Sequence, residues 1–351
     1  MFKTDYNKRV RLLEGAIRNF KLDSFLVTNE TNVSYVSGFR GHDSILLIVP
    51  GEKFFITDSR YVEQAREELE GFEVKLVASS TYTTIEELVG KLRLKRVGFE
   101  SMNLPYEVAT RLKDLLGKAE LLPAKNIVEN VRAIKDRGEV EKIRDSISLT
   151  KNVLDKIMSL IRPGLSEQYL SRTVELEFIK QGARPGFEPI VAAGANSSKP
   201  HAIPTDAKIA DDSFVMIDIG CNLNGYNSDL TRMALLGKAK DKFKKIYNIV
   251  RTAKELAIEK IRPGVKISEI DIAARRYIQK NGFGKYFGHS LGHGVGMEVH
   301  EQPTISKVSK GILSPGMVFT IEPAIYIPKF GGVRIEDMVL VTDKGSEVLS
   351  R

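Results

Sequence analysis

Four carboxylates stand inside, or directly beside, runs of Val, Ile, Phe and Met in the second half of this chain. They are Asp218 in FVMIDIG, Asp229 in NSDLTR, Glu322 in FTIEPAIYI and Glu336 in VRIEDMVLV. An ionised carboxylate on a buried strand destabilises the fold unless it is paired, hydrogen-bonded or bound to a metal ion. The pattern therefore predicts a fold in which these strands meet around divalent metal.

Histidine is scarce in the sequence, and most of it lies near those strands. Four of the five histidines are His201, His289, His293 and His300, and the last three share the glycine-rich stretch HSLGHGVGMEVHE. The glycines allow the backbone to approach a bound group closely. We expect His293 to complete the ligand set, while His289 and His300 hydrogen-bond the substrate or a tetrahedral intermediate.

The donor set indicates the kind of centre. Four carboxylates and one imidazole suit Mn²⁺, Co²⁺, Fe²⁺ or Zn²⁺ better than a thiolate site would, and they exceed what one tetrahedral Zn²⁺ uses. Two ions about 3.5–4 Å apart, bridged by shared carboxylates, would use them all and make hydroxide from a bridging water. Glu322 is the candidate base that takes the proton from the attacking water. A salt-bridged or capping carboxylate explains any one of these acids alone, but not the whole set.

The alternation of side chains along these strands adds neighbours to the acids. Residues two apart face the same side, so Thr231 shares a face with Asp229, and Arg334 shares one with Glu336. Thr231 therefore either orients a metal-binding carboxylate or is an ordinary β-branched strand residue.

The chain is predicted to divide near Pro123, which is expected to end a helix in YEVATRLKDLLGKAEL. Residues 1–125 alternate strand-like runs, among them SFLVTNETNVSYVSGF, with helical ones and predict an α/β domain. Its sequence carries no glycine-rich phosphate loop, but it does contain a polar turn, GFRGHDS, with Arg40 and His42. Residues 126–351 form the second domain, which holds the acids and histidines described above.

The second domain contains an internal sequence repeat. IMSLIRPGLSEQYLSRTVELEFIKQG resembles AIEKIRPGVKISEIDIAARRYIQKNG, since each reads as a helix, an Ile-Arg-Pro-Gly turn, a second helix and a closing glycine. Repeated supersecondary units of this kind indicate an internal duplication. We therefore expect two helical hairpins packed on one sheet.

The acidic and histidine motifs resemble those of the metallopeptidase family with the "pita-bread" fold, which contains methionine aminopeptidases, aminopeptidase P and prolidases. The matching segments are IDIG, NSDLTR, HSLGHGVGMEVHE, GMVFTIEPAIYIP and GGVRIEDMVLVT. The resemblance implies that Asp229 and Glu336 bridge two metal ions. It also implies that Asp218 completes the shell of one ion, and that His293 and Glu322 complete the shell of the other.

The same resemblance implies roles for the residues around the metals. His201, His289 and His300 match the histidines that bind the substrate and the intermediate, and Arg334 matches an arginine that braces this wall of the site. The implied cofactor is two divalent ions per subunit, with Mn²⁺ or Co²⁺ favoured over Fe²⁺ or Zn²⁺.

The resemblance covers essentially the whole chain and implies its fold class. It implies an α+β chain, with a C-terminal pita-bread domain of pseudo-twofold helix-hairpin and sheet repeats and a smaller α/β N-terminal domain of the creatinase/prolidase type. NVSYVSGF and ITDSRYVEQA carry the N-terminal match. Because methionine aminopeptidases lack that domain, the proline-directed branch is favoured, and the compact length resembles microbial prolidases, which cleave Xaa-Pro dipeptides.

Other activities stay open at this stage. TDSRYVEQA also occurs in Xaa-Pro aminopeptidases, which remove the N-terminal residue from longer peptides. Non-catalytic binding proteins of the same fold lose metal ligands, and creatinase is a metal-free hydrolase, so the complete ligand set argues against both. The resemblance further implies a homodimer, in which we expect Arg40 and His42 to reach the neighbouring subunit's cleft and limit substrate length.

Charge and cysteine content bound the partners and the compartment. The net charge is +8, but the lysines are spread along helices and alternate with acids, without the clustered basic stripe that nucleic-acid binding requires. No apolar run approaches the ~18 residues of a membrane span. The single cysteine, Cys221, permits no internal disulfide and fits a reducing cytoplasm. We therefore expect a cytoplasmic enzyme with a proline-containing peptide as its partner, and neither nucleic acid nor membrane.

Overall fold

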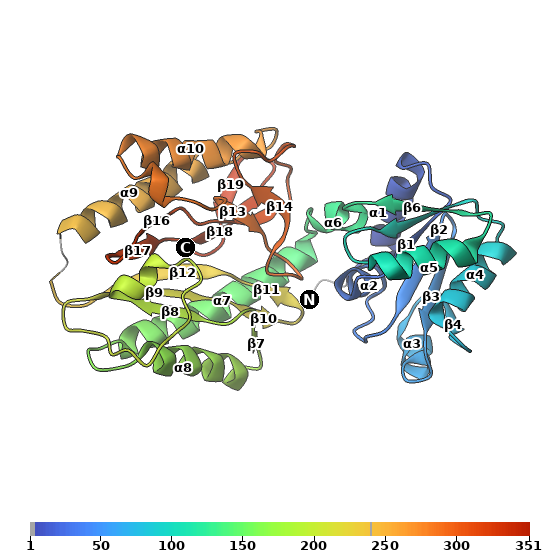
Figure 1. The fold of residues 1–351 in the computed structure, drawn as a ribbon, viewed down its shortest axis with the longest axis horizontal. Helices are drawn as coiled ribbons and strands as arrows, with labels where there is room; N and C mark the ends of the chain where they lie inside the picture. Colours follow the sequence, from blue (N-terminus) through green and yellow to red (C-terminus); the bar gives the residue numbers. More distant parts are fainter. Residues whose placement is uncertain (1–3, 239–240) are drawn as a thin grey trace. The chain divides into compact units, whose positions relative to one another are not determined.

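The computed structural model describes residues 4–238 and 241–351, which form two compact units that divide after Arg132 (Figure 1). The expected boundary, after residue 125, lies slightly earlier. The difference arises from α6 (Ile127–Arg132), which packs on α1 (Tyr6–Asn19) and α2 (Glu30–Ser37) of the N-terminal unit.

The described part of the N-terminal unit is built on a six-stranded sheet with the strand order β4-β3-β2-β1-β5-β6. The strands are β1 (Ser24–Val27), β2 (Ile45–Val49), β3 (Glu52–Thr57), β4 (Glu73–Leu76), β5 (Arg96–Glu100) and β6 (Glu120–Ala124). Its other helices are α3 (Val62–Glu68), α4 (Thr81–Lys91) and α5 (Tyr106–Leu116). β1 pairs antiparallel with β2 and parallel with β5, and this mixed sheet confirms the predicted α/β organisation.

Two local predictions in this unit are wrong. NVSYVSGF is the helix α2 rather than a strand, because the Asn29 side chain accepts a hydrogen bond from the Asn32 N–H and Gly38 ends the helix in the left-handed region. Pro123 does not end a helix: α5 ends at Leu116, and Pro123 lies in β6, at the edge of the sheet. An edge strand tolerates a residue that lacks an N–H.

A buried polar network attaches α6 to this unit. The Asn32 amide donates to Glu100 at 2.6 Å and to Glu129 at 2.7 Å, and it accepts from Arg132 at 2.7 Å. Burial raises the pKa of Glu100, against the hydrogen bonds that it accepts. Breaking this network would leave buried polar groups without partners, so α6 stays with the N-terminal unit.

The C-terminal unit contains two helical hairpins and several short antiparallel sheets. The helices are α7 (Arg137–Leu160), α8 (Glu167–Lys180), α9 (Asp241–Ile258) and α10 (Ile267–Lys280), with the 3₁₀ turns η1 (Gly194–Ser198) and η2 (Gly284–Tyr286). The strands of the first half are β7 (Arg184–Pro185), β8 (Ile190–Ala193), β9 (Phe214–Ile219), β10 (Cys221–Leu223), β11 (Tyr226–Asn227) and β12 (Leu230–Leu235). Those of the second half are β13 (Gly292–Gly294), β14 (Glu301–Ile305), β15 (Val318–Ile321), β16 (Ala324–Ile327), β17 (Gly331–Arg334), β18 (Asp337–Val341) and β19 (Ser346–Val348). The sheets that concern the site are β12-β9-β8, β14-β13-β15-β18-β19 and β16-β17.

The two hairpins confirm the predicted duplication, but the expectation that they pack on one sheet is wrong, because the described strands of this unit form four separate sheets. In Figure 1 the pair α7 and α8 and the pair α9 and α10 lie on opposite sides of the strands of this unit. The Gly164 N–H donates to the Ile209 carbonyl at 2.9 Å, and the Gly264 N–H donates to the Leu313 carbonyl at the same distance. The two Arg-Pro-Gly turns therefore make equivalent contacts, and each hairpin buries its own apolar face on its half of the strands.

Among the helices of the described residues, none combines the length and the apolar composition that crossing a bilayer requires.

Candidate active site

The five predicted ligands come together where strands of the two halves meet. Asp218 lies in β9, Asp229 directly precedes β12, His293 lies in β13, Glu322 follows β15 and Glu336 precedes β18. Ligand atoms of Asp229, His293 and Glu336 all lie within 4.8 Å of one another. His293 Nε2 is 3.3 Å from Glu322 Oε1 and 3.5 Å from Asp229 Oδ2. Four acids and one imidazole from five separate segments thus share one buried place in the C-terminal unit.

Burial and mutual repulsion set the electrostatics of the acids. Burial raises the pKa of Asp229 well above its ordinary value, and the charges of Glu336 and Asp218 raise it further. Burial also raises the pKa of Glu336, with the charges of Glu322 and Asp218 adding to the effect. Carboxylates packed this closely lower their free energy by binding protons or cations.

His293 and Glu322 form the exception in the cluster. Burial is the largest single influence and opposes the charged form of both groups, but their hydrogen bond, their mutual charge attraction and further neighbouring groups together outweigh it. The pKa of Glu322 is therefore lowered and that of His293 is raised. The Thr320 hydroxyl also contacts Glu322 Oε1 at 3.2 Å and accepts from the His293 N–H at 3.1 Å. Glu322 is therefore ionised and oriented from two sides.

Arg334 is the buried cation of the cluster, and its guanidinium reaches four oxygens. It donates to Asp218 Oδ2, to the Tyr326 hydroxyl, to the Pro200 carbonyl at 3.0 Å and to the Thr231 hydroxyl at 3.0 Å. Its reach follows from strand register, because Asp218 and Thr231 stand directly opposite each other in the β9–β12 pair. This contact agrees with the bracing role that the family resemblance implies for Arg334.

Thr231 connects this cation to a second acid. Its hydroxyl accepts from Arg334 and donates to Glu336 Oε2 at 2.7 Å. Of the two interpretations of Thr231, the contact favours the residue that orients a carboxylate.

One buried carboxylate oxygen in the cluster has no hydrogen-bond partner among the described residues: Asp218 Oδ1. Such an oxygen is costly to bury alone, and it fits a bound cation, as do the raised pKa values of Asp229 and Glu336. The donor set, all oxygen and imidazole nitrogen, matches divalent first-row ions.

The three histidines that are predicted to bind the substrate lie near the acids and differ in exposure. The rings of His300 and His293 lie 4.2 Å apart between centroids. Burial lowers the pKa of His300, and the charges of His293 and His201 lower it further. His201 itself is exposed and follows Pro200, whose carbonyl Arg334 holds.

His289 is the most firmly held of these histidines. Its Nδ1 lies 2.7 Å from the Ser290 carbonyl, and its ring lies between those of Phe287 and Tyr326, at 5.1 Å and 5.7 Å. Its Nε2 is buried and, within the described residues, has no hydrogen-bond partner. Burial lowers the pKa of His289.

Glycines of HSLGHGVGMEVHE permit this packing. A Cβ at Gly292 would lie 1.9 Å from the Thr320 carbonyl oxygen, and one at Gly294 would lie 2.1 Å from that of Gln302. Side chains at these positions would push β13 away from β14 and β15, and His293 lies between the two glycines. The sequence predicts that these glycines let the backbone approach a bound group; in the structure Gly292 and Gly294 allow neighbouring strands to approach instead.

Sequence reasoning missed several residues of this site. Tyr326 resembles an ordinary core aromatic in AIYI, yet its hydroxyl bonds Arg334, and burial raises its pKa to about 12. Asp271 and Arg275 on α10 resemble a surface ion pair, yet they hold the loop of His289.

In the N-terminal unit, Arg40 is exposed and His42 lies 2.9 Å from Glu30.

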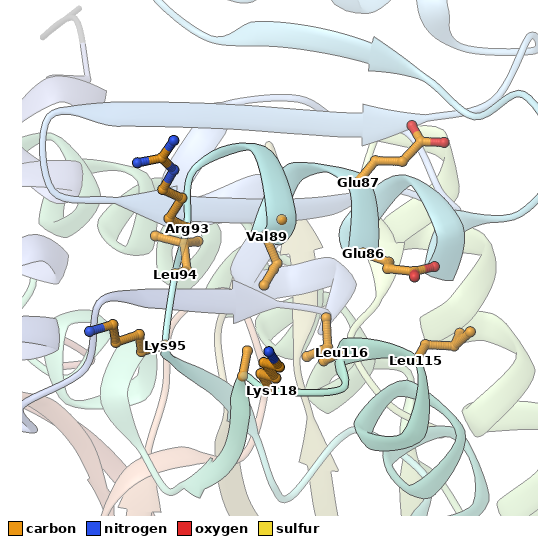
Figure 2. Close-up of a pocket in the computed structure, with 11 residues that line it drawn as sticks. Glu86, Glu87, Val89, Arg93, Leu94, Lys95, Leu115, Leu116 and Lys118 are labelled. Atoms are coloured by element: carbon orange, nitrogen blue, oxygen red, sulfur yellow. The ribbon is translucent and has the colours of Figure 1, made fainter.

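A separate hollow lies within the N-terminal unit. It has a volume of about 430 Å³ and lies between the C-terminal ends of α4 and α5. Figure 2 shows Val89 and Leu116 directed into it, while Glu87 and Arg93 point away. All of its lining residues belong to the N-terminal unit, so it shares no residue with the acidic cluster.

Comparison with known proteins gives a consistent result. The model of metallopeptidase family M24 matches residues 141–343, and that of the creatinase/prolidase N-terminal domain matches residues 9–134. A Xaa-Pro dipeptidase of Pyrococcus horikoshii is 34% identical over 98% of this chain and 97% of its own length.

Two solved structures are similar along their whole length. A Xaa-Pro dipeptidase from Bacillus anthracis has a TM-score of 0.95 and 38% identity, covering 99% of this chain and 98% of that one. An X-Pro aminopeptidase from Thermotoga maritima has a TM-score of 0.86 and 33% identity, covering 96% of this chain and 97% of that one.

Proposed function

Because the chain is a peptidase of metallopeptidase family M24 with a creatinase/prolidase N-terminal domain, we propose that it hydrolyses the Xaa-Pro bond of dipeptides. The observation that carries the proposal is the convergence of Asp229, His293 and Glu336, whose ligand atoms lie within 4.8 Å of one another, with Asp218 and Glu322 beside them. Relatives along the full length of the chain are Xaa-Pro dipeptidases, which supports a proline-directed substrate.

The proposed cofactor is a pair of divalent ions, Mn²⁺ or Co²⁺ in preference to Fe²⁺ or Zn²⁺. The proposed ligands are Asp218, Asp229, His293, Glu322 and Glu336. When bound, the ions would activate a water and polarise the scissile carbonyl. The unpartnered Asp218 Oδ1 and the raised pKa values of two of the acids support this assignment.

The chain's own side chains would then orient the reactants. Arg334 and Thr231 fix the carboxylates of Asp218 and Glu336. Glu322, ionised and oriented by Thr320 and His293, would take the proton from the attacking water.

The histidines near the acids would hold the substrate. His289 and His300 would hydrogen-bond the substrate or the tetrahedral intermediate, and His201 would contact the substrate from its exposed loop. The unpartnered, buried Nε2 of His289 supports this role.

The second candidate is removal of the N-terminal residue from longer Xaa-Pro peptides, which the similarity to the Thermotoga maritima aminopeptidase favours. We also propose a homodimer in which Arg40 and His42 limit substrate length, and a cytoplasmic location that fits the single, buried Cys221.

The test compares Met-Pro with the same peptide extended by one residue after proline, each with Mn²⁺, with Co²⁺ and with chelator. We expect metal-dependent cleavage of the dipeptide alone. Comparable cleavage of the longer peptide would make the enzyme an aminopeptidase, and no metal-dependent cleavage of either would overturn the proposed function.

A further inference from the structure

A buried ion pair on α10 lies behind the loop that carries His289. Arg275 donates from Nε to Asp271 Oδ1 at 2.7 Å and from a terminal nitrogen to Oδ2 at 2.8 Å, so the pair is bidentate. The Asp271 side chain is fully buried, and that of Arg275 is 20% exposed. The reaction described above uses neither residue.

Both members of the pair also form hydrogen bonds with the backbone of residues 287–291. Arg275 donates to the Phe287 carbonyl at 2.9 Å and to the His289 carbonyl at 2.7 Å. Asp271 accepts from the Leu291 N–H at 3.1 Å. Three backbone groups in five residues are therefore tied to one helix, on both sides of His289.

Further contacts connect the ion pair to the imidazole of His289 and to the backbone of Glu322. The Arg275 guanidinium lies 4.2 Å from the centre of the Phe287 ring, whose neighbour is the edge-on ring of His289. The Leu291 carbonyl accepts from the Glu322 N–H at 2.8 Å. Because the Ser290 carbonyl can only accept, His289 Nδ1 carries the hydrogen, and its buried Nε2 is left as an acceptor for a hydrogen bond from the substrate.

Comparison of the two halves indicates that packing alone does not require this pair. The Arg-Pro-Gly turns align Gly164 with Gly264, and the closing glycines align Gly182 with Gly282, so Ser171 and Glu175 match Asp271 and Arg275. Within the described residues, the side chain of Ser171 in the first half makes one hydrogen bond, to the Pro189 carbonyl at 3.2 Å. The position equivalent to Asp271 is therefore packed without a carboxylate, although α8 buries Glu167 and Glu177 elsewhere. A buried carboxylate lowers stability unless it is well paired.

We propose that Asp271 and Arg275 are positioning residues that hold His289 for the substrate, a role that rests on the proposed function. The pair sets the backbone of residues 287–291 and, through Phe287, the plane of the imidazole. Displacing a substrate-binding group by about 1 Å is enough to lower the rate by as much as ~100-fold, which makes such a support measurable.

The kinetic test uses Arg275→Met in the full chain, with Arg276→Met as the matched control, because Arg276 is the exposed neighbour on the same helix. With Mn²⁺ and a Xaa-Pro dipeptide, we expect kcat of Arg275→Met to fall by at least about tenfold, with KM changed by less than about threefold. In a His289→Ala background the same substitution should cost less than about twofold more, because the two residues act as one unit. Arg276→Met should match the wild type.

The second readout does not depend on turnover. Ring ¹⁵N signals of the five histidines are recorded for the full chain with diamagnetic Zn²⁺. The wild type and Arg276→Met should show His289 with its hydrogen on Nδ1, whereas Arg275→Met should shift that signal towards the average of the two tautomers. If Arg275→Met does not fold, Arg275→Lys replaces it. Lysine keeps the positive charge beside Asp271 but cannot make the bidentate hydrogen bonds of a guanidinium, so the same changes in kcat and in the ring signal are expected, with smaller magnitude.

Two results would overturn the positioning role of the pair. One is a folded Arg275→Met variant with the kcat of the wild type and an unchanged His289 signal. The other is a loss of kcat on Arg275→Met that is as large in the His289→Ala background as in the wild type. Absence of any Xaa-Pro cleavage by the wild type would instead refute the proposed function, and the ring signal would still decide whether the pair holds His289.

Discussion

Replacing Thr231 with Val should weaken metal binding without reshaping the site. Thr231 is fully buried, and its hydroxyl lies 3.0 Å from Arg334 Nε and 2.7 Å from Glu336 Oε2. Val keeps the shape but leaves a buried guanidinium N–H and a carboxylate oxygen unpaired. A hydrogen bond to a charged group contributes roughly 1.5–3 kcal/mol, so losing two should lower the free energy of unfolding by about 3 kcal/mol or somewhat more.

The affinity for metal is a more specific measurement than the free energy of unfolding. A carboxylate that loses the neighbour which orients it typically loses ~10–100-fold in metal affinity, and we expect that loss for Mn²⁺ in a calorimetric titration of Thr231→Val. The control is Thr57→Val in the N-terminal unit, where an equally buried hydroxyl shares a 3.0 Å hydrogen bond with Ser44. The control should lose about 1 kcal/mol of stability and no metal affinity. Equal metal affinity in the two variants would refute the argument that Thr231 orients Glu336.

Three further predictions follow from the same cluster and from the polar turn. Glu336→Ala should remove activity and most bound metal while the protein remains folded, as measured by metal content and circular dichroism, and full activity would contradict its proposed role. Because the folded-state pKa values of Asp229 and Glu336 are raised, these two groups stabilise the metal-free protein most at low pH. Their contribution is lost as the pH rises from about 4 towards the folded-state values. The melting temperature of the metal-free wild type should therefore fall, relative to Asp229→Asn/Glu336→Gln, over that range, and a constant difference would contradict the assigned shifts. Finally, replacing Arg40 and His42 by Ala should increase cleavage of peptides longer than two residues relative to dipeptides, and an unchanged length preference would exclude that role.

Asp218, Glu322 and Glu336 could be predicted as members of the cluster from the sequence because each is a local anomaly, whereas Asp229 lies among the polar residues of NSDLTR. A carboxylate in FVMIDIG or VRIEDMVLV contradicts its apolar neighbours, and no knowledge of distant contacts is needed to see it. The duplication was visible for a similar reason, since Arg-Pro-Gly and the closing glycine recur at matched positions, and the contacts of Gly164 and Gly264 repeat in space. Helix α2 escaped because its apolar residues alternate like those of a strand, and only the Asn29 cap and Gly38 indicate its ends.

Supporting residues escaped because their partners lie far away in the sequence. Tyr326 gains its function from Arg334, and a tyrosine in an apolar strand is usually a core residue. Asp271 did leave a signal: Ile267, Ala274 and Ile278 define the buried face of α10, and Asp271 falls on it. The rule that exposed the acids on strands, a carboxylate on an apolar face, therefore applies to helices as well. Applied with a period of 3.6 instead of 2, it identifies Asp271 as a helical residue that needs a partner.

The site belongs to neither half of the duplication alone. The first half supplies Asp218 and Thr231 on β9 and β12, and the second supplies Arg334 and Glu336 beside β17 and β18. The only hydrogen bonds that Asp218 Oδ2 and the Thr231 hydroxyl make in the described residues are to these groups of the other half. Each half therefore carries buried polar groups that the other must satisfy, which raises the cost of separating the halves. A metal ion bound between the two halves would stabilise their contact further, because it binds the protein when the halves are together and not when they are separated.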